Sequence, residues 1–156
     1  MNSIGNAIGE LCKIILPIPE ESYLGNFDSS IAICTLSSMD LLKKISNSEL
    51  LNHISIAGRL LSENKGIDSI IKYLNQNKKV KTLIVCGKEV WGHKAGHSLI
   101  KLYENGIDEH GRIINSISPD PFLISIKSEI NYFRNEIKLV NMINETNFET
   151  IEKYVY

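Results

Sequence analysis

The sequence has few cysteines, almost no net charge and no long apolar run. Its three cysteines, Cys12, Cys34 and Cys86, form no CxxC pair. An odd number argues against a disulfide framework, which a chain of 156 residues does not need. The 17 basic and 18 acidic residues give a net charge of −1. This balance argues against a nucleic-acid partner, because phosphate binding needs a basic field.

Membrane insertion by this chain is not expected either. No stretch approaches the roughly 20 apolar residues that cross a bilayer. The amino terminus lacks the basic region and apolar run of a signal peptide. Together with the cysteine usage, this predicts a cytoplasmic protein. Hydrophobic residues make up 43% of the chain, enough for one self-sufficient core.

Short apolar segments alternate with amphipathic ones along most of the chain. The apolar runs 31–36 and 82–86 predict buried strands, and 53–58 is a further short apolar segment. A brief strand is expected at 113–114 and a last one at 137–142. The helical patterns lie between these segments, near 41–45, over 65–74, up to 104, over 122–133 and after 145. This alternation predicts an α/β fold with a parallel sheet.

The domain boundary is expected near residue 30. Pro17 and Pro19 punctuate the first part of the chain, and Gly25 and Asp28 lie near its end. We therefore expect an N-terminal arm over residues 1–29 and a single domain over 30–156.

The most unusual residues follow the strand at 82–86, where ligands bind in open α/β sheets. Segment 86–97 holds the only Trp, three glycines and two histidines. Gly87 and Gly92 permit sharp turns and let a large ligand approach the backbone. Gly96 would let a helix pack closely or leave room for that ligand.

One interpretation of this segment is a phosphate-binding loop. Gly87 and Gly92 have the spacing of GxxxxGK between a strand and a helix. However, His93 stands where the lysine is needed, and Ala95 follows Lys94 where Ser or Thr would be needed. Those residues reach phosphate and magnesium, so the pattern argues against this interpretation.

A second interpretation is a zinc site. His93 and His97 are four residues apart and would share a helical face, with Glu89 four residues earlier. The HExxH motif needs a glutamate directly after its first histidine, and here that residue is Lys94. No Cys or acidic cluster supplies further ligands.

A third interpretation is a corrinoid site. A corrin ring brings four nitrogens to its cobalt, so one neutral imidazole on a loop is a sufficient protein ligand. His93 to Gly96 supplies the HxxG of the corrinoid motif DxHxxG, but Trp91 occupies the Asp position. The usual carboxylate partner of the imidazole is therefore missing at that spacing.

Several blocks of the sequence resemble the A subunit of tetrahydromethanopterin S-methyltransferase, the corrinoid-carrying component of a methanogen enzyme complex. The similarity runs from about Ile31 to Ile143, which is most of the chain. The matching blocks are Val85–Val90 with Gly92, His93, Lys94 and Gly96; Gly58 with Glu63-Asn64 and Gly66-Ile67; Glu104–Asp108; and Pro121–Leu123. Their matching order and spacing make the resemblance far more specific than HxxG alone.

The resemblance implies a Rossmann-like, doubly wound, mainly parallel sheet flanked by helices, which binds cobalamin or a related cobamide. It implies that His93 is the reversible lower axial ligand of cobalt and displaces the nucleotide base of the cofactor. The family moves a methyl group from methyl-tetrahydromethanopterin to cobalt and then to coenzyme M. The resemblance further implies that the imidazole binds and releases cobalt during each cycle, and that in the full complex this event is coupled to sodium transport.

The same resemblance implies that other methyltransferase subunits supply the donor and acceptor sites. Membrane-bound members of the family end in a transmembrane helix that this sequence lacks, so we expect a truncated form of such a member or a soluble homologue. Two alternatives stay open. One is a corrinoid storage or sensing protein with no transfer role, and the other is a phosphate- or nucleotide-binding regulatory domain.

We therefore expect one cofactor site at the carboxyl edge of the sheet. His93 is the expected cobalt ligand, and His97 would hydrogen-bond the side groups of the cofactor. Lys88 and Lys94 would meet its amide or phosphate groups, and Trp91 would pack on the corrin edge. The other expected lining residues are Thr35, Leu36, Ser37, Gly58, Asn64, Gly66, Gly87, Glu89, Val90, Gly92 and Gly96.

Overall fold

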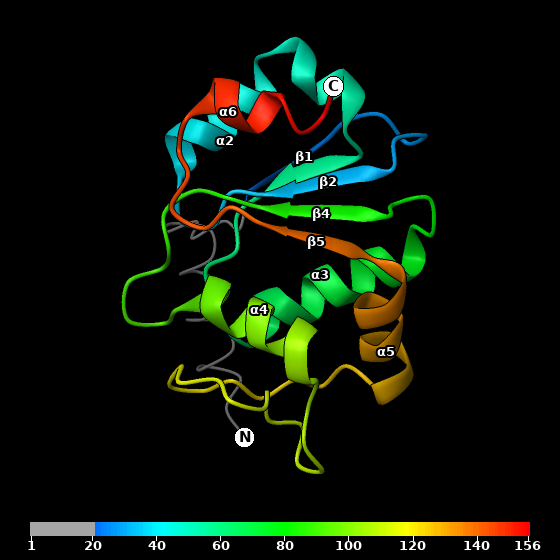
Figure 1. Ribbon diagram of the computed structural model, residues 1–156, viewed down its shortest axis with the longest axis vertical. Coiled ribbons are helices and arrows are strands. Elements are labelled where there is room, and N and C mark those ends of the chain that lie inside the picture. Colours follow the sequence, from blue (N-terminus) through cyan, green and yellow to red (C-terminus); the bar gives the residue numbers. More distant parts are fainter. Residues whose placement is uncertain (1–20) are drawn as a thin grey trace, which may run out of the picture.

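A computed structural model describes residues 21–156, which form a five-stranded sheet in the order β1-β3-β2-β4-β5 (Figure 1). Strands β2 to β5 run parallel to one another, and β1 lies antiparallel along β3 at one edge. The strands are β1 (Ser22–Leu24), β2 (Ile31–Cys34), β3 (Ile56–Gly58), β4 (Thr82–Val85) and β5 (Lys138–Asn141). The predicted mainly parallel sheet is confirmed.

Helices cover both faces of this sheet, as a doubly wound fold requires (Figure 1). One face carries α2 (Met39–Ser46), the 3-10 helix η1 (Glu49–His53) and α6 (Phe148–Glu152). The opposite face carries α3 (Lys65–Gln76), α4 (Ala95–Asn105) and α5 (Lys127–Glu136). The Rossmann-like architecture is therefore confirmed.

The central strands are apolar throughout because both of their faces are covered. In β2, Ile33 packs with α2, η1 and α6, while Ala32 and Cys34 pack with α3 and α4. In β4, Ile84 and Leu83 divide between the two layers in the same way. Side chains alternate along a strand, so a strand covered on both sides needs an almost unbroken apolar run.

The order of the strands creates a switch point between β2 and β4. The chain leaves β2 for β3 on one side and later returns to β4 on the other side of β2. The connections after β2 and β4 therefore start at neighbouring strand ends and leave on opposite faces. Such a point is the usual ligand site of an open α/β sheet.

The edge strand β1 was not expected from the sequence. It is three residues long and only its middle residue, Tyr23, turns toward the core, so it gives no periodic signal. It lies within the span 1–29 expected as an arm. The remainder of that span, residues 1–20, lies outside the described residues.

Two expectations in the crossover between β4 and β5 were wrong. The strand expected at 113–114 is reduced to isolated bridges, one of which joins Ile113 to Ile107. The helix expected from Phe122 begins only at Lys127. The carboxylate of Asp68 accepts hydrogen bonds from the backbone N–H groups of residues 124 and 125, which lie before the helix.

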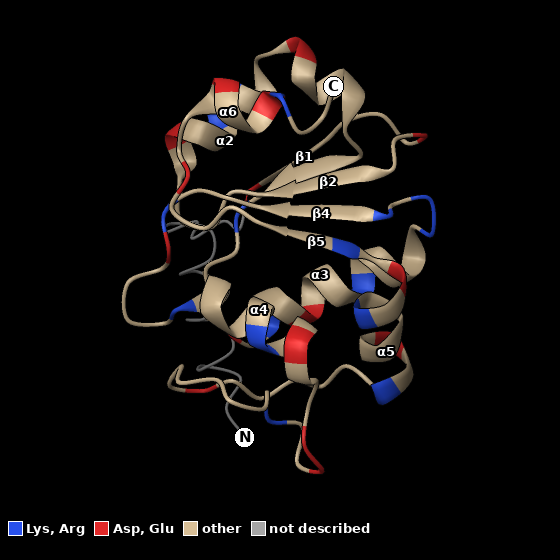
Figure 2. Cartoon of the chain, viewed as in Figure 1, with Lys and Arg blue, Asp and Glu red and all other residues tan. Residues whose placement is uncertain are grey.

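Acidic and basic residues are interspersed along the helices and loops in the view of Figure 2. No helix within residues 21–156 combines the length and the apolar character needed to span a bilayer.

Candidate functional site

The loop from β4 to α4 carries most of the predicted site, and its base is held by Gly87. Gly87 has a positive φ of 79°. Its N–H donates to the carbonyl of Glu145 and its carbonyl accepts from Asn144 N–H, both at 2.7 Å. A Cβ at this position would lie 2.1 Å from the carbonyl oxygen of Thr35. Only glycine therefore lets the loop pass so close to the end of β2.

The loop after β2 holds the next residue, Lys88. The N–H and hydroxyl of Ser37 both donate to the Lys88 carbonyl, at 3.1 and 2.8 Å. Lys88 N–H in turn donates to Ser38 Oγ at 2.8 Å. Helix α2 begins directly after Ser38, but the Ser38 hydroxyl bonds the loop and does not cap the helix. The two loops at the switch point thus form one hydrogen-bonded unit.

The Glu89 carboxylate closes the amino terminus of α4. Its Oε1 accepts from the N–H groups of Val90 and Gly96 at 2.7 and 2.9 Å, and its Oε2 accepts from His97 N–H at 2.7 Å. Gly96 and His97 lie in the first turn, where N–H groups lack helical partners and an anion is favoured. A Cβ at Gly96 would lie 2.9 Å from Glu89 Oε2. The space expected for a ligand beside Gly96 is therefore filled by this carboxylate.

His93 presents an exposed ring in a fixed orientation. Its Nδ1 lies 2.9 Å from Glu63 Oε2, and the two side chains are 59% and 2% exposed. The other carboxylate oxygen of Glu63 accepts from Asp120 N–H at 2.9 Å. A carboxylate only accepts, so in the neutral imidazole Nδ1 carries the proton and Nε2 has the lone pair that a metal could bind. The partner that is missing at Trp91 is supplied from 30 positions earlier in the chain.

His97 holds the segment that follows residue 115. Its Nε2 accepts from Ile117 N–H at 3.2 Å. Burial lowers the pKa of His97, and the positive charge of Lys101 lowers it further, so the neutral acceptor form is favoured. The neighbouring buried Ser98 hydroxyl lies 2.6 Å from the hydroxyls of both Ser116 and Ser118. His97 is therefore engaged by the protein itself.

Asn64 connects the start of α3 to the same crossover. Its Oδ1 accepts from Lys65 N–H at 2.7 Å, and its Nδ2 donates to the carbonyl and carboxylate of Asp120 at 3.2 and 3.0 Å. Residues 116–120 are thus tied to α4 through His97 and to α3 through Asn64 and Glu63.

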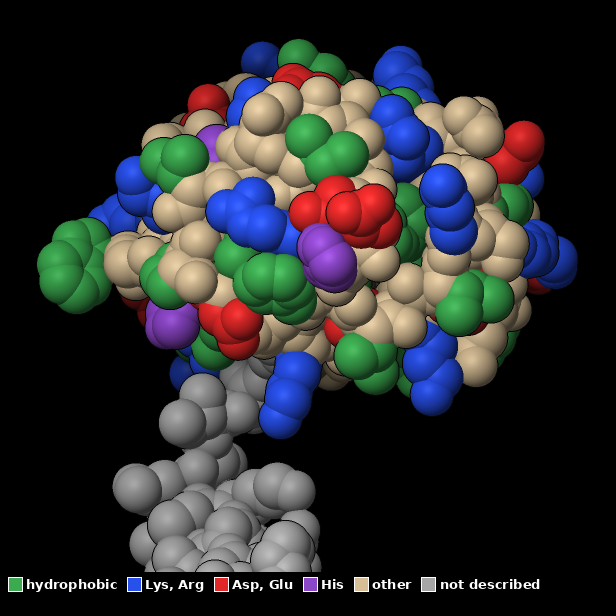
Figure 3. Space-filling model, turned by 90° about the horizontal axis from the view of Figure 1, so that it is seen from below, with side chains coloured by type: hydrophobic (Ala, Val, Ile, Leu, Met, Phe, Trp, Pro, Cys, Tyr) green, Lys and Arg blue, Asp and Glu red, His purple; other side chains and the backbone are tan. Residues whose placement is uncertain are grey.

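The rest of the loop is open to ligands or partners. Trp91 is 95% exposed, and a Cβ at Gly92 would meet no heavy atom within 4 Å. Lys88 and Lys94 are also exposed. Figure 3 views the helix-covered face of α3 to α5, where hydrophobic and histidine side chains are exposed among charged ones.

Other predicted lining residues support the loops from beneath. Thr35 and Leu36 are completely buried, and Val90 is almost so. Gly58 ends β3 beside Ser22 of β1, and Gly66 is buried in the first turn of α3. These residues position the site, and their side chains are not presented at its surface.

Sequence reasoning missed Glu63 as a site residue. It appeared only as part of a matching block beside Asn64. The available signal was an acidic residue directly before a helix start, which carries no indication of a histidine partner. The hydrogen bond from Asp120 N–H to Glu63 could not be predicted either, because it depends on how the crossover folds back onto α3.

Within the described residues, the His93 imidazole is not part of a cluster of metal ligands. Among residues 21–156, no group of three or more His, Cys, Asp or Glu side chains is placed to hold a metal ion. The zinc interpretation therefore has no ligand set in this part of the chain. His93 offers one nitrogen donor, which fits a ring that brings four of its own.

The fold and the loop together define a class: a Rossmann-like α/β domain whose loop from β4 to α4 lies at the switch point of a mainly parallel sheet. The family model for the A subunit of tetrahydromethanopterin S-methyltransferase matches residues 16–156. The chain belongs to this family.

Curated relatives agree with this assignment. A protein of Methanosarcina barkeri, named as the A subunit of a "Putative methyltransferase Mtx", is 38% identical over 141 residues, which cover 89% of this chain and 68% of the relative. The A subunit of tetrahydromethanopterin S-methyltransferase from Methanosphaera stadtmanae is 33% identical, over 89% of this chain and 55% of its own length. An A subunit of the same enzyme from Methanothermobacter thermautotrophicus, numbered 2 in its name, is 31% identical over 82% of this chain and 72% of its own length.

Proposed function

We propose that this chain is a cobamide-binding methyl carrier in which His93 is the reversible lower axial ligand of cobalt. The observation that carries the proposal is the pair formed by His93 and Glu63. An exposed imidazole lies 2.9 Å from a buried carboxylate, on the loop at the switch point of the sheet. The bound cobamide would supply a cobalt centre that accepts and gives up a methyl group.

The residues around His93 have separable roles in this proposal. His93 Nε2 is the donor atom, and Glu63 holds the proton on Nδ1 whether or not Nε2 is coordinated. A carboxylate partner of this kind raises the basicity of an imidazole ligand and fixes its tautomer. Asp120 N–H holds the second oxygen of Glu63. Trp91, Lys88 and Lys94 would meet the periphery of the cofactor.

Membership of this family supports a proposal for the transfer partners. We propose methyl-tetrahydromethanopterin as donor and coenzyme M as acceptor. Other methyltransferase subunits would supply the sites for both substrates. The exposed position of His93 suits this division, because a cofactor seated on the loop would face a docking partner.

Reconstitution with cobalamin tests the ligand assignment. The full chain is incubated with hydroxocobalamin, freed of excess cofactor, reduced to the Co(II) form and examined by electron paramagnetic resonance. Coordination by histidine predicts that ¹⁵N-histidine labelling changes the nitrogen splitting from a triplet to a doublet. H93A should lose this change, while H110A, at an exposed position outside the loop, should keep it.

If the ¹⁵N-histidine protein keeps the triplet of the unlabelled protein, His93 is not the cobalt ligand. Transfer is tested separately, by mixing the methylated protein with its partner subunits and coenzyme M and measuring methyl-coenzyme M. Binding with the histidine signature but no transfer to any partner would favour a storage or sensing role.

A further inference from the structure

The Glu63 carboxylate that contacts His93 is itself held by a backbone group of the crossover. Its Oε2 lies 2.9 Å from His93 Nδ1, and its Oε1 accepts from Asp120 N–H at 2.9 Å. Glu63 is buried, so bulk water does not replace a partner that is lost. The Asp120 N–H therefore helps to fix the plane of the carboxylate that faces the imidazole.

The sequence around Asp120 restricts the direction of this N–H. Asp120 lies between Pro119 and Pro121, neither of which has an N–H of its own. A proline fixes its own φ and favours an extended backbone at the residue before it. The carbonyl of Pro121 accepts from Ile113 N–H at 2.9 Å, which anchors the segment within the crossover. Asp120 thus has few backbone conformations available, and a small number of contacts can hold it in one of them.

Asn64 supplies two such contacts. Its Oδ1 accepts from Lys65 N–H at 2.7 Å, which sets the orientation of the side-chain amide. Its Nδ2 then donates to the carbonyl and to the carboxylate of Asp120, at 3.2 and 3.0 Å. An amide nitrogen carries two hydrogens, and Asp120 accepts both. Asn64 therefore has no amide hydrogen left for a bound molecule.

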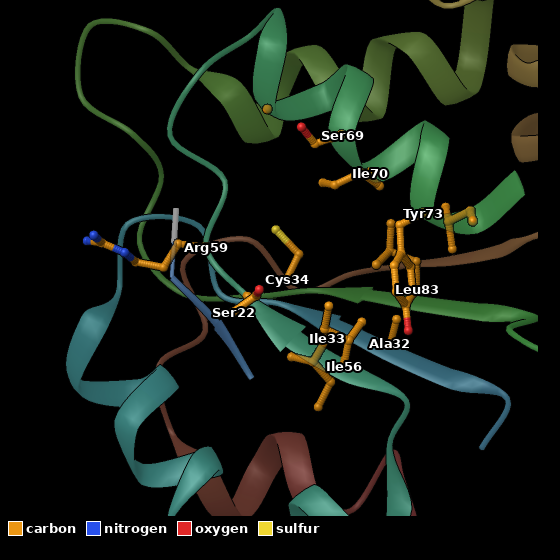
Figure 4. Close-up of a pocket in the computed structure, with 13 residues that line it drawn as sticks. Ser22, Ala32, Ile33, Cys34, Ile56, Arg59, Ser69, Ile70, Tyr73 and Leu83 are labelled. Atoms are coloured by element: carbon orange, nitrogen blue, oxygen red, sulfur yellow. The ribbon is translucent and has the colours of Figure 1, made fainter. Parts of the chain in front are cut away.

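Packing against the sheet leaves a gap beneath the start of α3. A half-enclosed and mainly apolar cavity of about 340 Å³ separates the helix from the sheet, and Gly66 of the first turn lines it. Figure 4 shows Ile70 of α3 across this gap from Cys34 and Leu83. The hydrogen bonds from Asn64 to the crossover therefore supplement a helix–sheet contact that is incomplete.

We propose that Asn64 and Asp120 are positioning residues for His93 and act through Glu63. The inference rests on the proposed function, because it assigns their role to the presentation of His93 Nε2 toward cobalt. Asn64 holds Asp120, the N–H of Asp120 holds Glu63, and Glu63 holds the proton on His93 Nδ1. A ring kept in one tautomer does not have to reorganise before Nε2 coordinates, so this chain of contacts raises the affinity for the metal.

The first test measures the tautomer of His93 in the full chain without cofactor. The ¹⁵N-histidine protein is examined by long-range ¹H–¹⁵N correlation at pH 8.5, above the range in which histidine usually titrates. The His93 signals are assigned by their absence in H93A. The wild type should show the Nδ1–H tautomer, and N64D should show a mixture with the Nε2–H tautomer. Aspartate still accepts from Lys65 N–H, but it lacks both amide hydrogens and places a carboxylate beside Asp120.

Matched variants separate positioning from a general effect on the fold. N64D/D120N exchanges donor and acceptor between the two positions, so it should return the ring toward the wild-type tautomer. N147D makes the same substitution at the cap of α6, on the opposite face of the sheet, where Asn147 Oδ1 accepts from Thr150 N–H at 2.8 Å. It should leave the His93 signals unchanged. N64S keeps a capping oxygen without the amide and takes the place of N64D if that variant does not fold.

The second test measures the affinity for cobalamin by absorbance titration. N64D should lower this affinity by about three- to tenfold, which is less than the loss of the direct partner Glu63 should cause. N64D/D120N should recover part of the loss, and N147D should bind as the wild type does.

The outcomes separate the two proposals. The positioning roles are overturned if folded N64D keeps the Nδ1–H tautomer alone, if N64D/D120N recovers nothing, or if the tautomer shifts while the affinity for cobalamin does not change. His93 stands as the ligand in each of these cases when its ¹⁵N signature is present. If the tautomer shifts in a chain that binds no cobalamin, Asn64 and Asp120 do hold the ring, and the proposed function fails instead.

Discussion

The imidazole of His93 and the carboxylate of Glu63 come from loops at the ends of different strands, and their nearest atoms lie 2.9 Å apart. Glu63 is buried and bonded to Asp120 N–H on its other side. The orientation of the exposed ring is thus set from within the protein.

This pair predicts a selective defect in E63Q. Glutamine keeps the shape of the side chain but cannot serve as a charged acceptor for Nδ1–H. Loss of such a partner typically lowers metal affinity about 10- to 100-fold. We expect a loss of this order in the affinity for cobalamin, measured by absorbance titration.

E89Q provides the comparison for E63Q, because the Glu89 carboxylate bonds backbone N–H groups near His93 rather than the imidazole. It should change the affinity for cobalamin much less than E63Q does. An equal loss in both variants would assign the effect to general disturbance of the loop.

The close approach of Gly96 to Glu89 predicts that alanine at position 96 destabilises the protein, although alanine has a higher helix propensity than glycine. In a helix, Gly to Ala normally stabilises by about 0.5–1 kcal/mol. Here a new Cβ would meet Glu89 Oε2 at 2.9 Å and Leu36 Cδ1 at 3.0 Å. G96A should therefore lower the free energy of unfolding, by about 1–3 kcal/mol, as measured by urea denaturation.

The double variant E89A/G96A checks the cause. E89A alone should cost about 0.5–2 kcal/mol, as the loss of a cap does. With the carboxylate removed, G96A should destabilise less than it does in the wild type, so the two effects will not add. Simple additivity would show that Glu89 is not the obstacle.

Much of the fold was predictable because its signals are local. The strands β2 and β4 are apolar on both faces, and α4 ends at Gly106, where φ is +76° and glycine is favoured. The edge strand β1 was not predictable, since only Tyr23 faces inward. The start of α5 was misplaced because Asp68, from a different helix, accepts the backbone N–H groups of residues 124 and 125, a contact that has no local signature.

The candidate site could be selected from the sequence by its position, but its contacts only in part. His93 was singled out because the loop after a parallel strand is where ligands usually bind, and the short HxxG pattern lies there. Glu63 was not, since a contact across 30 residues has no local signature. Glu89 and Gly96 were expected to contact the cofactor, whereas their contacts with one another account for both residue types.

The two buried cysteines predict thiols that do not react in the native protein. Cys34 and Cys86 are 3% and 0% exposed, and burial raises the pKa of the Cys86 thiol. The thiolate is the reactive form, so access is suppressed at both thiols and ionisation is suppressed at Cys86. In a C12S variant, Ellman's reagent should detect no thiol in the native protein and two thiols per chain after denaturation, since the sequence has three cysteines. Rapid modification without denaturant would contradict the packing of β2 and β4.

The lowered pKa of His97 predicts that the free energy of unfolding decreases as the pH falls. Its pKa is lowered, first by burial and then by Lys101, from an ordinary value of 6.5. Between that value and the lowered pKa, the unfolded chain binds the proton more readily than the folded one. The contribution of His97 to stability is therefore full above pH 6.5 and is lost as pH falls through the lowered pKa.

The structural cause of this dependence is the bond from Ile117 N–H, because a protonated imidazole can no longer accept it. H97Q keeps an acceptor oxygen at this position and removes the titration. The positive charges of Lys94 and Lys101 disfavour protonation of His97, whereas the negative charges of Glu89 and Glu104 favour it. All four residues are the same in the wild type and in H97Q, so the comparison isolates the titration of His97. Urea unfolding of both proteins from pH 7.5 to pH 5 should show the wild type losing more stability than H97Q. Parallel curves would mean that His97 titrates alike in the folded and unfolded chain, and that its bond to Ile117 does not depend on its protonation.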